Sequence, residues 1–110
     1  MSFYGLSLGY ADDPTFKWEG GNHSGNIPSI VIDFGSVGGV SGCATARNLL
    51  ESPKYGGREL DWGASGAKLS KSQVIEFLSE FYSGHERDRA LELVAPLSDD
   101  QIYLLFSWEQ

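Results

Sequence analysis

Apolar and polar residues alternate along residues 3–10, FYGLSLGY, where every second position from Tyr4 to Tyr10 is large and apolar. A period of two is typical of a β-strand that buries one face. The sequence ADDP follows, and two aspartates before Pro14 favour a turn. Aromatic residues alternate again along residues 15–19, TFKWE. The pattern therefore predicts a β-hairpin formed by these two stretches.

The next apolar stretch, residues 29–34, reads SIVIDF and is β-branched and continuously apolar. Such a run is typical of a central strand that is buried on both faces, so we expect one here. A glycine-rich loop separates it from a predicted short helix over residues 42–51, which Pro53 ends. A Gly-Gly turn then leads into a predicted short strand around residues 60–62.

The clearest local pattern lies in LSKSQVIEFLSEFYSG, residues 69–84. Ser70 is a typical N-cap, and Gln73 stands three residues later, which is the spacing of a capping box. Apolar residues then recur every three to four positions, as on one face of a helix. Gly84 is a residue type that commonly closes a helix. The sequence predicts a helix over residues 71–83.

Two elements follow in the C-terminal quarter of the chain. Residues 85–97, HERDRALELVAPL, predict a helix that Pro96 ends. Residues 102–108, IYLLFSW, are ambiguous, because Ser98 and Gln101 imitate a second capping box whereas the aromatic and apolar composition favours a strand. We predict a strand, since a compact sheet needs a closing partner.

This order of strands, helix, short strand, two helices and strand is typical of an α+β fold. We expect a mainly antiparallel sheet with two to three helices packed on one face. The chain has 110 residues. That length suits one domain and is too short for two of ordinary size, so residues 1–110 are expected to form a single domain.

The charge of the chain narrows the classes of partner. Eight Lys and Arg residues against fifteen Asp and Glu residues give a net charge of −7. An acidic surface repels nucleic acid and attracts basic proteins, although the same charge also serves solubility alone. One cysteine cannot form an internal disulfide, and no apolar run reaches the length of a membrane span. We expect a cytoplasmic protein, monomeric or weakly dimeric, without membrane contact.

The glycine-rich loop is the first candidate for chemistry. Its glycines are Gly35, Gly38, Gly39 and Gly42. Their spacing matches neither a dinucleotide fingerprint nor a P-loop. A loop between a strand and a helix still presents backbone N–H groups that could bind an anion. We favour a simple connection, and an anion or nucleotide site stays open as the alternative.

The single cysteine is the second candidate. Cys43 stands near a predicted helix start, where the helix dipole favours a thiolate. Catalysis would need His23 or His85 as a base, oriented by Asp33 or Asp88. The spacing does not show that these groups converge, and an unpaired cysteine among small residues more often packs in a core. The histidines and cysteine show no zinc spacing, so we expect no metal and no cofactor.

The third candidate is acidic side chains beside aromatic ones, in residues 12–19 and 59–62. The candidate partner-binding residues are Asp12, Asp13, Trp18, Glu19, Glu59, Asp61 and Trp62. Aromatic anchors among carboxylates suit an interface with a basic protein. The competing interpretation is that both tryptophans belong to the core and that the acids are solvated turn residues.

The sequence-based hypothesis is therefore a non-enzymatic, acidic binding module. Its most concrete form is an inhibitor of the immunity-protein type, which neutralises a basic protein such as a bacterial toxin by covering its active cleft. The alternative is a small anion-binding, nucleotide-binding or cysteine-dependent enzyme that uses the Gly35–Gly42 loop and Cys43. A structural subunit or adaptor without chemistry is the third possibility.

Overall fold

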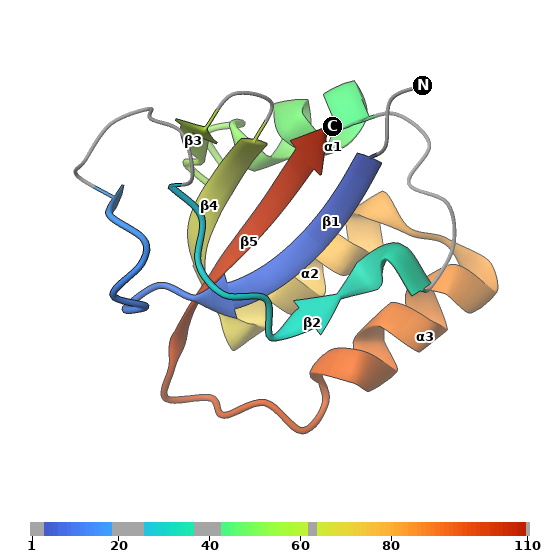
Figure 1. The fold of residues 1–110 in the computed structure, drawn as a ribbon. Helices are drawn as coiled ribbons and strands as arrows, with labels where there is room; N and C mark the ends of the chain where they lie inside the picture. Colours follow the sequence, from blue (N-terminus) through green and yellow to red (C-terminus); the bar gives the residue numbers. More distant parts are fainter. Residues whose placement is uncertain (1–3, 19–25, 37–42, 62–63, 110) are drawn as a thin grey trace.

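A computed structural model of the chain describes residues 4–18, 26–36, 43–61 and 64–109 (Figure 1). Its strands are β1 (Tyr4–Tyr10), β2 (Ile32–Asp33), β3 (Arg58–Asp61), β4 (Ala64–Ser70) and β5 (Ile102–Glu109). Its helices are α1 (Cys43–Leu50), α2 (Lys71–Phe81) and α3 (Gly84–Val94), with a short 3₁₀ helix, η2 (Phe34–Ser36). None of the described helices is long and apolar enough to cross a membrane.

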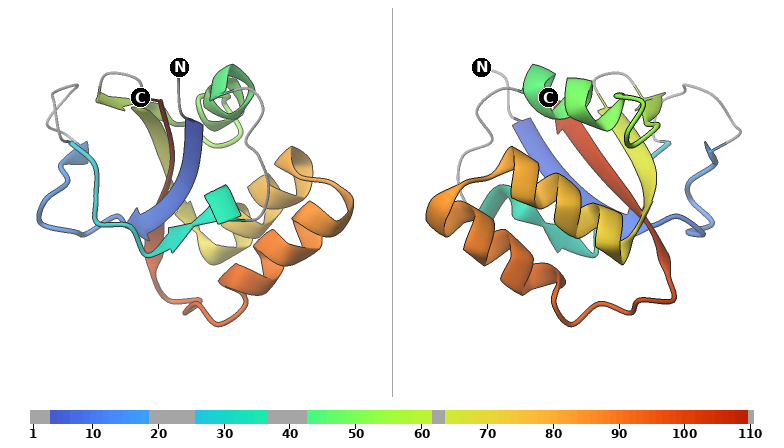
Figure 2. Two further views of the ribbon diagram at one scale, coloured as in Figure 1. Left: turned by 45° about the vertical axis from the view of Figure 1, so that its right-hand side comes forward. Right: turned by 180° about the vertical axis from the view of Figure 1, so that it is seen from behind.

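The strands form one antiparallel sheet in the order β2-β1-β5-β4-β3. Figure 2 shows the helices on one face of this sheet, while the chain that follows β1 runs over the other face. The α+β prediction, with an antiparallel sheet and helices on one face, is confirmed. β1 and β5, the first and last strands of the sequence, are hydrogen-bonded to each other at the centre of the sheet.

The central strand β5 is apolar on both faces because both faces are covered. Tyr103 and Leu105 pack in the core beneath the helices, together with residues such as Phe77. Leu104 and Phe106 pack in a second core on the opposite face. The strand predicted for residues 102–108 is thus confirmed. Burial on both faces also explains why its sequence lacks the alternation of a half-exposed strand.

The second core is built from large residues on β5 and small residues on its neighbours. Gly5 of β1 lies directly opposite Trp108 of β5. A Cβ atom at Gly5 would lie 2.0 Å from the indole, so only glycine lets the ring lie against β1. The Trp108 indole N–H donates to the Ser7 hydroxyl, 3.1 Å away. Phe16 comes from the chain after β1 and closes this core.

The hairpin predicted for residues 3–10 and 15–19 is wrong, since residues 15–18 form no strand and residue 19 lies outside the described residues. The backbone groups of Lys17 instead bond the Asn26 side chain, whose Oδ1 accepts from Lys17 N at 2.8 Å and whose Nδ2 donates to Lys17 O at 3.0 Å. Both edges of β1 are taken by β2 and β5, so no edge was left for a hairpin partner.

The central strand predicted for residues 29–34 is also wrong. β2 contains only two residues and pairs with β1 at one edge of the sheet. Ile30 and Val31 are 51% and 39% exposed. The Asp33 carboxylate accepts the Gly35 N–H at 2.9 Å, which turns the chain into η2 directly after the strand. β5 occupies the central position in the sheet that was expected for this segment.

The helix predictions hold, with shifted ends. The capping box of α2 is present, as Gln73 N donates to Ser70 Oγ at 3.3 Å and Ser70 N donates to Gln73 Oε1 at 3.0 Å. The helix ends at Phe81 because Tyr82 adopts an extended conformation and is buried. Gly84, with φ of 58°, opens α3 and does not close α2 as predicted.

Candidate functional site

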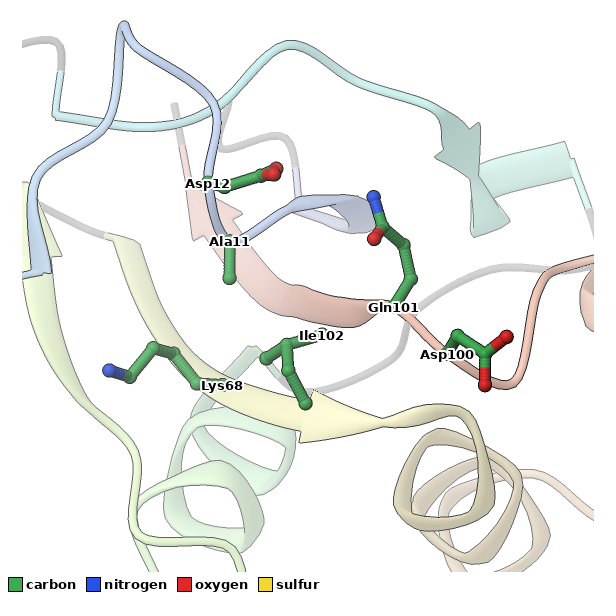
Figure 3. A pocket seen from close by; sticks show the side chains of 6 residues that line it. All are labelled: Ala11, Asp12, Lys68, Asp100, Gln101 and Ile102. Atoms are coloured by element: carbon green, nitrogen blue, oxygen red, sulfur yellow. The ribbon is translucent and has the colours of Figure 1, made fainter.

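Two Asp-Asp pairs of the sequence, residues 12–13 and 99–100, lie at the same end of the sheet. The first pair follows β1 in the sequence ADDP, and the second precedes β5 in SDDQ. Because β1 and β5 are antiparallel neighbours, the end of one strand lies beside the start of the other. Asp12 and Asp100 therefore line the same pocket, which has a volume of about 390 Å³ (Figure 3). We call these two carboxylates the acidic rim.

The rest of the pocket combines an apolar side chain with polar ones. Its other lining residues are Ala11, Lys68, Gln101 and Ile102. Ile102 is 52% exposed, so the pocket presents a large apolar side chain beside the two carboxylates. The Lys68 side chain extends away from Asp100 (Figure 3) and forms no ion pair with a described carboxylate. The pocket lining therefore combines one exposed apolar side chain with two carboxylates and one ammonium group, which form no ion pairs among the described residues.

The loop that carries Asp100 is held by buried or half-buried groups. The Tyr103 hydroxyl donates to Ser98 O at 2.8 Å, and Ser98 Oγ accepts from Asp100 N at 3.1 Å. The Lys71 ammonium donates to Ala95 O and Leu97 O at 2.8 and 2.9 Å. These bonds fix the backbone on both sides of Asp99, whose side chain is 85% exposed. The negative charge is therefore presented on an ordered segment, which lowers the entropy cost of binding.

Asp13, a predicted partner-binding residue, is engaged within the fold. Its carboxylate accepts hydrogen bonds from the Thr15 hydroxyl, from Thr15 N at 2.8 Å and from Ser29 N at 3.1 Å. These bonds, with those from Thr15 contributing most, hold the pKa of Asp13 below its usual value. Asp13 thereby joins the turn after β1 to the segment that precedes β2.

Trp18 has different neighbours from those expected. Its half-buried ring contacts Phe16 edge-on, with ring centroids 6.4 Å apart. The Lys68 ammonium lies 5.1 Å and the Arg58 guanidinium carbon 5.6 Å from the Trp18 ring centroid. The groups that the structure places against this tryptophan are cations, whereas the sequence suggested carboxylates.

Of the remaining predicted residues, Glu59 has a described side chain, and it does not line the pocket of the acidic rim. Glu59 is exposed on β3 and lies opposite Ser65, whereas Arg58 lies opposite Gly66 on the other face of the sheet. Asp61 is the last residue of β3, and its side chain is not among those described. Glu19 and Trp62 lie outside the described residues.

The alternative chemical sites remain predictions. Residues 37–42 of the glycine loop and His23 lie outside the described residues, and so does the side chain of Cys43. The Gly35 N–H is bonded to Asp33, so it is not available to an anion. His85 is exposed on α3. The described part of the chain holds no group of three metal-ligating side chains.

Comparison with protein-family models, with curated proteins and with solved structures finds no match to this chain. The site must therefore be interpreted from its own chemistry. Sequence reasoning missed Asp99, Asp100 and Ile102. Their signal was the second Asp-Asp pair, which stands before the last strand as the first pair stands after the first strand. The two Asp-Asp pairs come together because β1 and β5 are antiparallel neighbours, which the sequence alone does not show.

Proposed function

We propose that this chain is a non-enzymatic binding module that captures a basic protein through the acidic rim. In its most specific form it is a cytoplasmic inhibitor of the immunity type, which covers the basic cleft of a toxin. The observation that carries the proposal is the pocket in which Asp12 and Asp100 flank the exposed Ile102. Carboxylates around an apolar centre match a basic cleft in both charge and contact.

The two components of this surface act at different stages of binding. The net charge of −7 and the exposed carboxylates accelerate the approach of a basic partner, since steering acts over roughly 8 Å at physiological ionic strength. Ile102 becomes desolvated only in the final complex, so it slows dissociation.

The test uses the product of the reading frame directly upstream as the candidate basic partner. Association rates are measured for the parent and for the double variant Asp12→Lys/Asp100→Lys at 50 and 300 mM salt. We expect the double variant to associate about tenfold more slowly or worse at low salt, with a weaker dependence on salt. Ile102→Ser should mainly raise the dissociation rate.

The matched control is Glu51→Lys/Glu92→Lys, which reverses two exposed carboxylates on the helical side of the molecule. Both double variants change the net charge from −7 to −3, since each reversal adds two charges. If the two double variants slow association equally, overall charge is sufficient and the rim is not the interface. If no basic partner binds the parent, the proposed function itself fails.

A further inference from the structure

Two cations gather beneath one tryptophan on the face of the sheet opposite the helices. Arg58 on β3 lies opposite Gly66 on β4, and Lys68 stands two residues further along β4. Diagonal neighbours of this kind share a face of the sheet, with their Cβ atoms roughly 7–8 Å apart. Both side chains reach the Trp18 ring, at 5.6 and 5.1 Å from its centroid.

Among the described residues, Arg58 and Lys68 lack the ion pairs and hydrogen bonds that Lys54 and Lys71 have. Lys54 forms ion pairs with Glu76 and Glu80, and the Lys71 ammonium is bonded to two carbonyl oxygens. For Arg58 and Lys68, residues 4–18, 26–36, 43–61 and 64–109 supply no ion pair and no side-chain hydrogen bond. Within the part of the chain that the structure describes, the two neighbouring cations therefore repel each other without a compensating carboxylate.

The ring offsets only part of this repulsion. A cation near an exposed or half-exposed indole gains a modest attraction to the ring face, and packing covers the aliphatic part of each side chain. The ring accepts no hydrogen bonds from the guanidinium plane or from the ammonium as a carboxylate or phosphate would. No described residue occupies the N–H donors of Arg58 and Lys68, which lie beside each other on a partly exposed surface.

We propose that Arg58 and Lys68 form a binding site for a phosphate monoester, with Trp18 as the residue that positions them. A phosphate monoester carries close to two negative charges at neutral pH, which matches the two cations. Arg58 supplies a planar, two-pronged set of donors and Lys68 a point charge. The phosphate belongs either to a small free ester or to a phosphorylated side chain of another protein. This site does not depend on the proposed capture of a basic partner.

The first experiment titrates the whole chain with inorganic phosphate and follows two-dimensional ¹H–¹⁵N spectra at pH 7.5. The reference titration uses sodium chloride at the same ionic strength. We expect saturable shifts at the backbone amides of residues 58 and 68, at the Arg58 side-chain N–H and at the Trp18 indole N–H. Shifts that grow linearly, or that chloride reproduces, would overturn the proposal.

Substitutions then assign the site to its two cations. Arg58→Gln and Lys68→Gln each remove one charge but keep part of the aliphatic side chain, so the fold should survive. We expect each to weaken phosphate binding about tenfold or more, because a charge-assisted hydrogen bond is lost. The matched control, Arg87→Gln, removes a charge from an exposed position on α3 and should leave the affinity unchanged. If all three variants weaken phosphate binding equally, the overall charge of the protein explains the effect and the proposed site is refuted.

A third comparison identifies the source of the phosphate. A short glycine-serine peptide is titrated with and without a phosphate on its serine, beside inorganic phosphate. Equal affinities for the phosphopeptide and for inorganic phosphate indicate a free ester as the ligand. A phosphopeptide that binds about tenfold more tightly indicates a phosphorylated protein. If the unphosphorylated peptide binds as well as the phosphorylated one, the site does not recognise phosphate.

Discussion

Two tyrosines in the main core differ in one feature, which makes them a matched pair for a stability measurement. Tyr55 and Tyr82 are 6% and 5% exposed and belong to the same core. The Tyr55 hydroxyl donates to Glu80 Oε1 at 2.9 Å. The Tyr82 hydroxyl has no hydrogen-bond partner among the described residues. Replacing each tyrosine with phenylalanine removes the same atom from two different environments.

The expected magnitudes follow from these environments. Tyr55→Phe loses a hydrogen bond to a partly exposed carboxylate, which should cost about 1 kcal/mol of unfolding free energy. Tyr82→Phe removes a buried polar group that has given up its bonds to water, so it should be neutral or stabilise the protein by up to about 1 kcal/mol. The two variants should therefore differ by about 1–2 kcal/mol, which is several degrees in the melting temperature of a domain of this size.

Urea unfolding followed by circular dichroism measures the difference. The slope of the unfolding free energy against urea should be the same for both variants, since the folded and unfolded states expose similar surface. If Tyr82→Phe destabilises the protein as much as Tyr55→Phe does, the Tyr82 hydroxyl has a partner and the reasoning is refuted.

The same pair predicts how the protein responds to alkaline pH. Burial is the main cause that raises the pKa of both tyrosines, in each case to about 12 from an ordinary value of 10. Because the unfolded state ionises near pH 10 and the folded state only near pH 12, the contribution of these tyrosines to the unfolding free energy is constant below pH 10 and falls as the pH rises from 10 through 12. Each phenylalanine variant should therefore lose less stability than the parent over this range. An unchanged alkaline profile in both variants would contradict the burial of the hydroxyls.

Two further predictions concern the turns that frame the fold. Ser70→Ala removes the N-cap of α2 and should cost about 1 kcal/mol in chemical denaturation, and an unchanged midpoint would show that the cap contributes nothing. Asp13 has a lowered pKa, so its contribution to stability is present above its unfolded value of 3.8 and is lost as the pH falls through the folded value. Asp13→Asn should therefore flatten the loss of melting temperature between about pH 5 and pH 2, and a parallel decline in both proteins would exclude this role.

The sequence predicted the α+β class and the helices because these depend on local signals. The capping box of α2 acts within four residues, and apolar spacing identified each helix without knowledge of its neighbours. Strand positions depend on partners distant in the sequence. SIVIDF and IYLLFSW both contain an apolar run, IVI at residues 30–32 and IYLLF at residues 102–106, yet the first lies at an edge with Ile30 exposed and the second is central. Composition alone does not distinguish them.

β4 was not predicted from the sequence, for a related reason. Its sequence, ASGAKLS, is rich in small residues with low β-propensity. Gly66 opposes Phe106 on β5, so a small residue here leaves room for a large one on the neighbouring strand. The favourable contact belongs to the pair of strands and is visible only when both are placed side by side.

The candidate site was partly within reach of the sequence. Asp12 was chosen because it stood near aromatic residues, and it does line the pocket, but its apolar neighbour there is Ile102 from the other end of the chain. Trp18 was chosen for the same reason and lies against Arg58 and Lys68. Nearness in the sequence was a poor guide to nearness in space, because the segment after β1 crosses to the far strands of the sheet.

Lys68 belongs to both proposed surfaces, and this shared position has a consequence for binding. It lines the pocket with Asp12 and Asp100 and also contacts the Trp18 ring beside Arg58. A phosphate bound to the cations would neutralise Lys68, and the rim would then present a stronger negative potential to a basic partner. Each ligand would increase the affinity for the other by the same factor, because coupling between two sites is reciprocal.

Lys68→Gln separates this coupling from the two binding events themselves. The variant should bind phosphate less tightly, yet associate faster with a basic partner, because a positive charge has been removed from the pocket that Asp12 and Asp100 also line. Phosphate should accelerate association of the parent and have no such effect on the variant. Arg58→Gln is the informative comparison, since Arg58 does not line the pocket. It should weaken phosphate binding while leaving association in the absence of phosphate nearly unchanged. If both variants associate at the parental rate, Lys68 does not influence the rim and the two surfaces act independently.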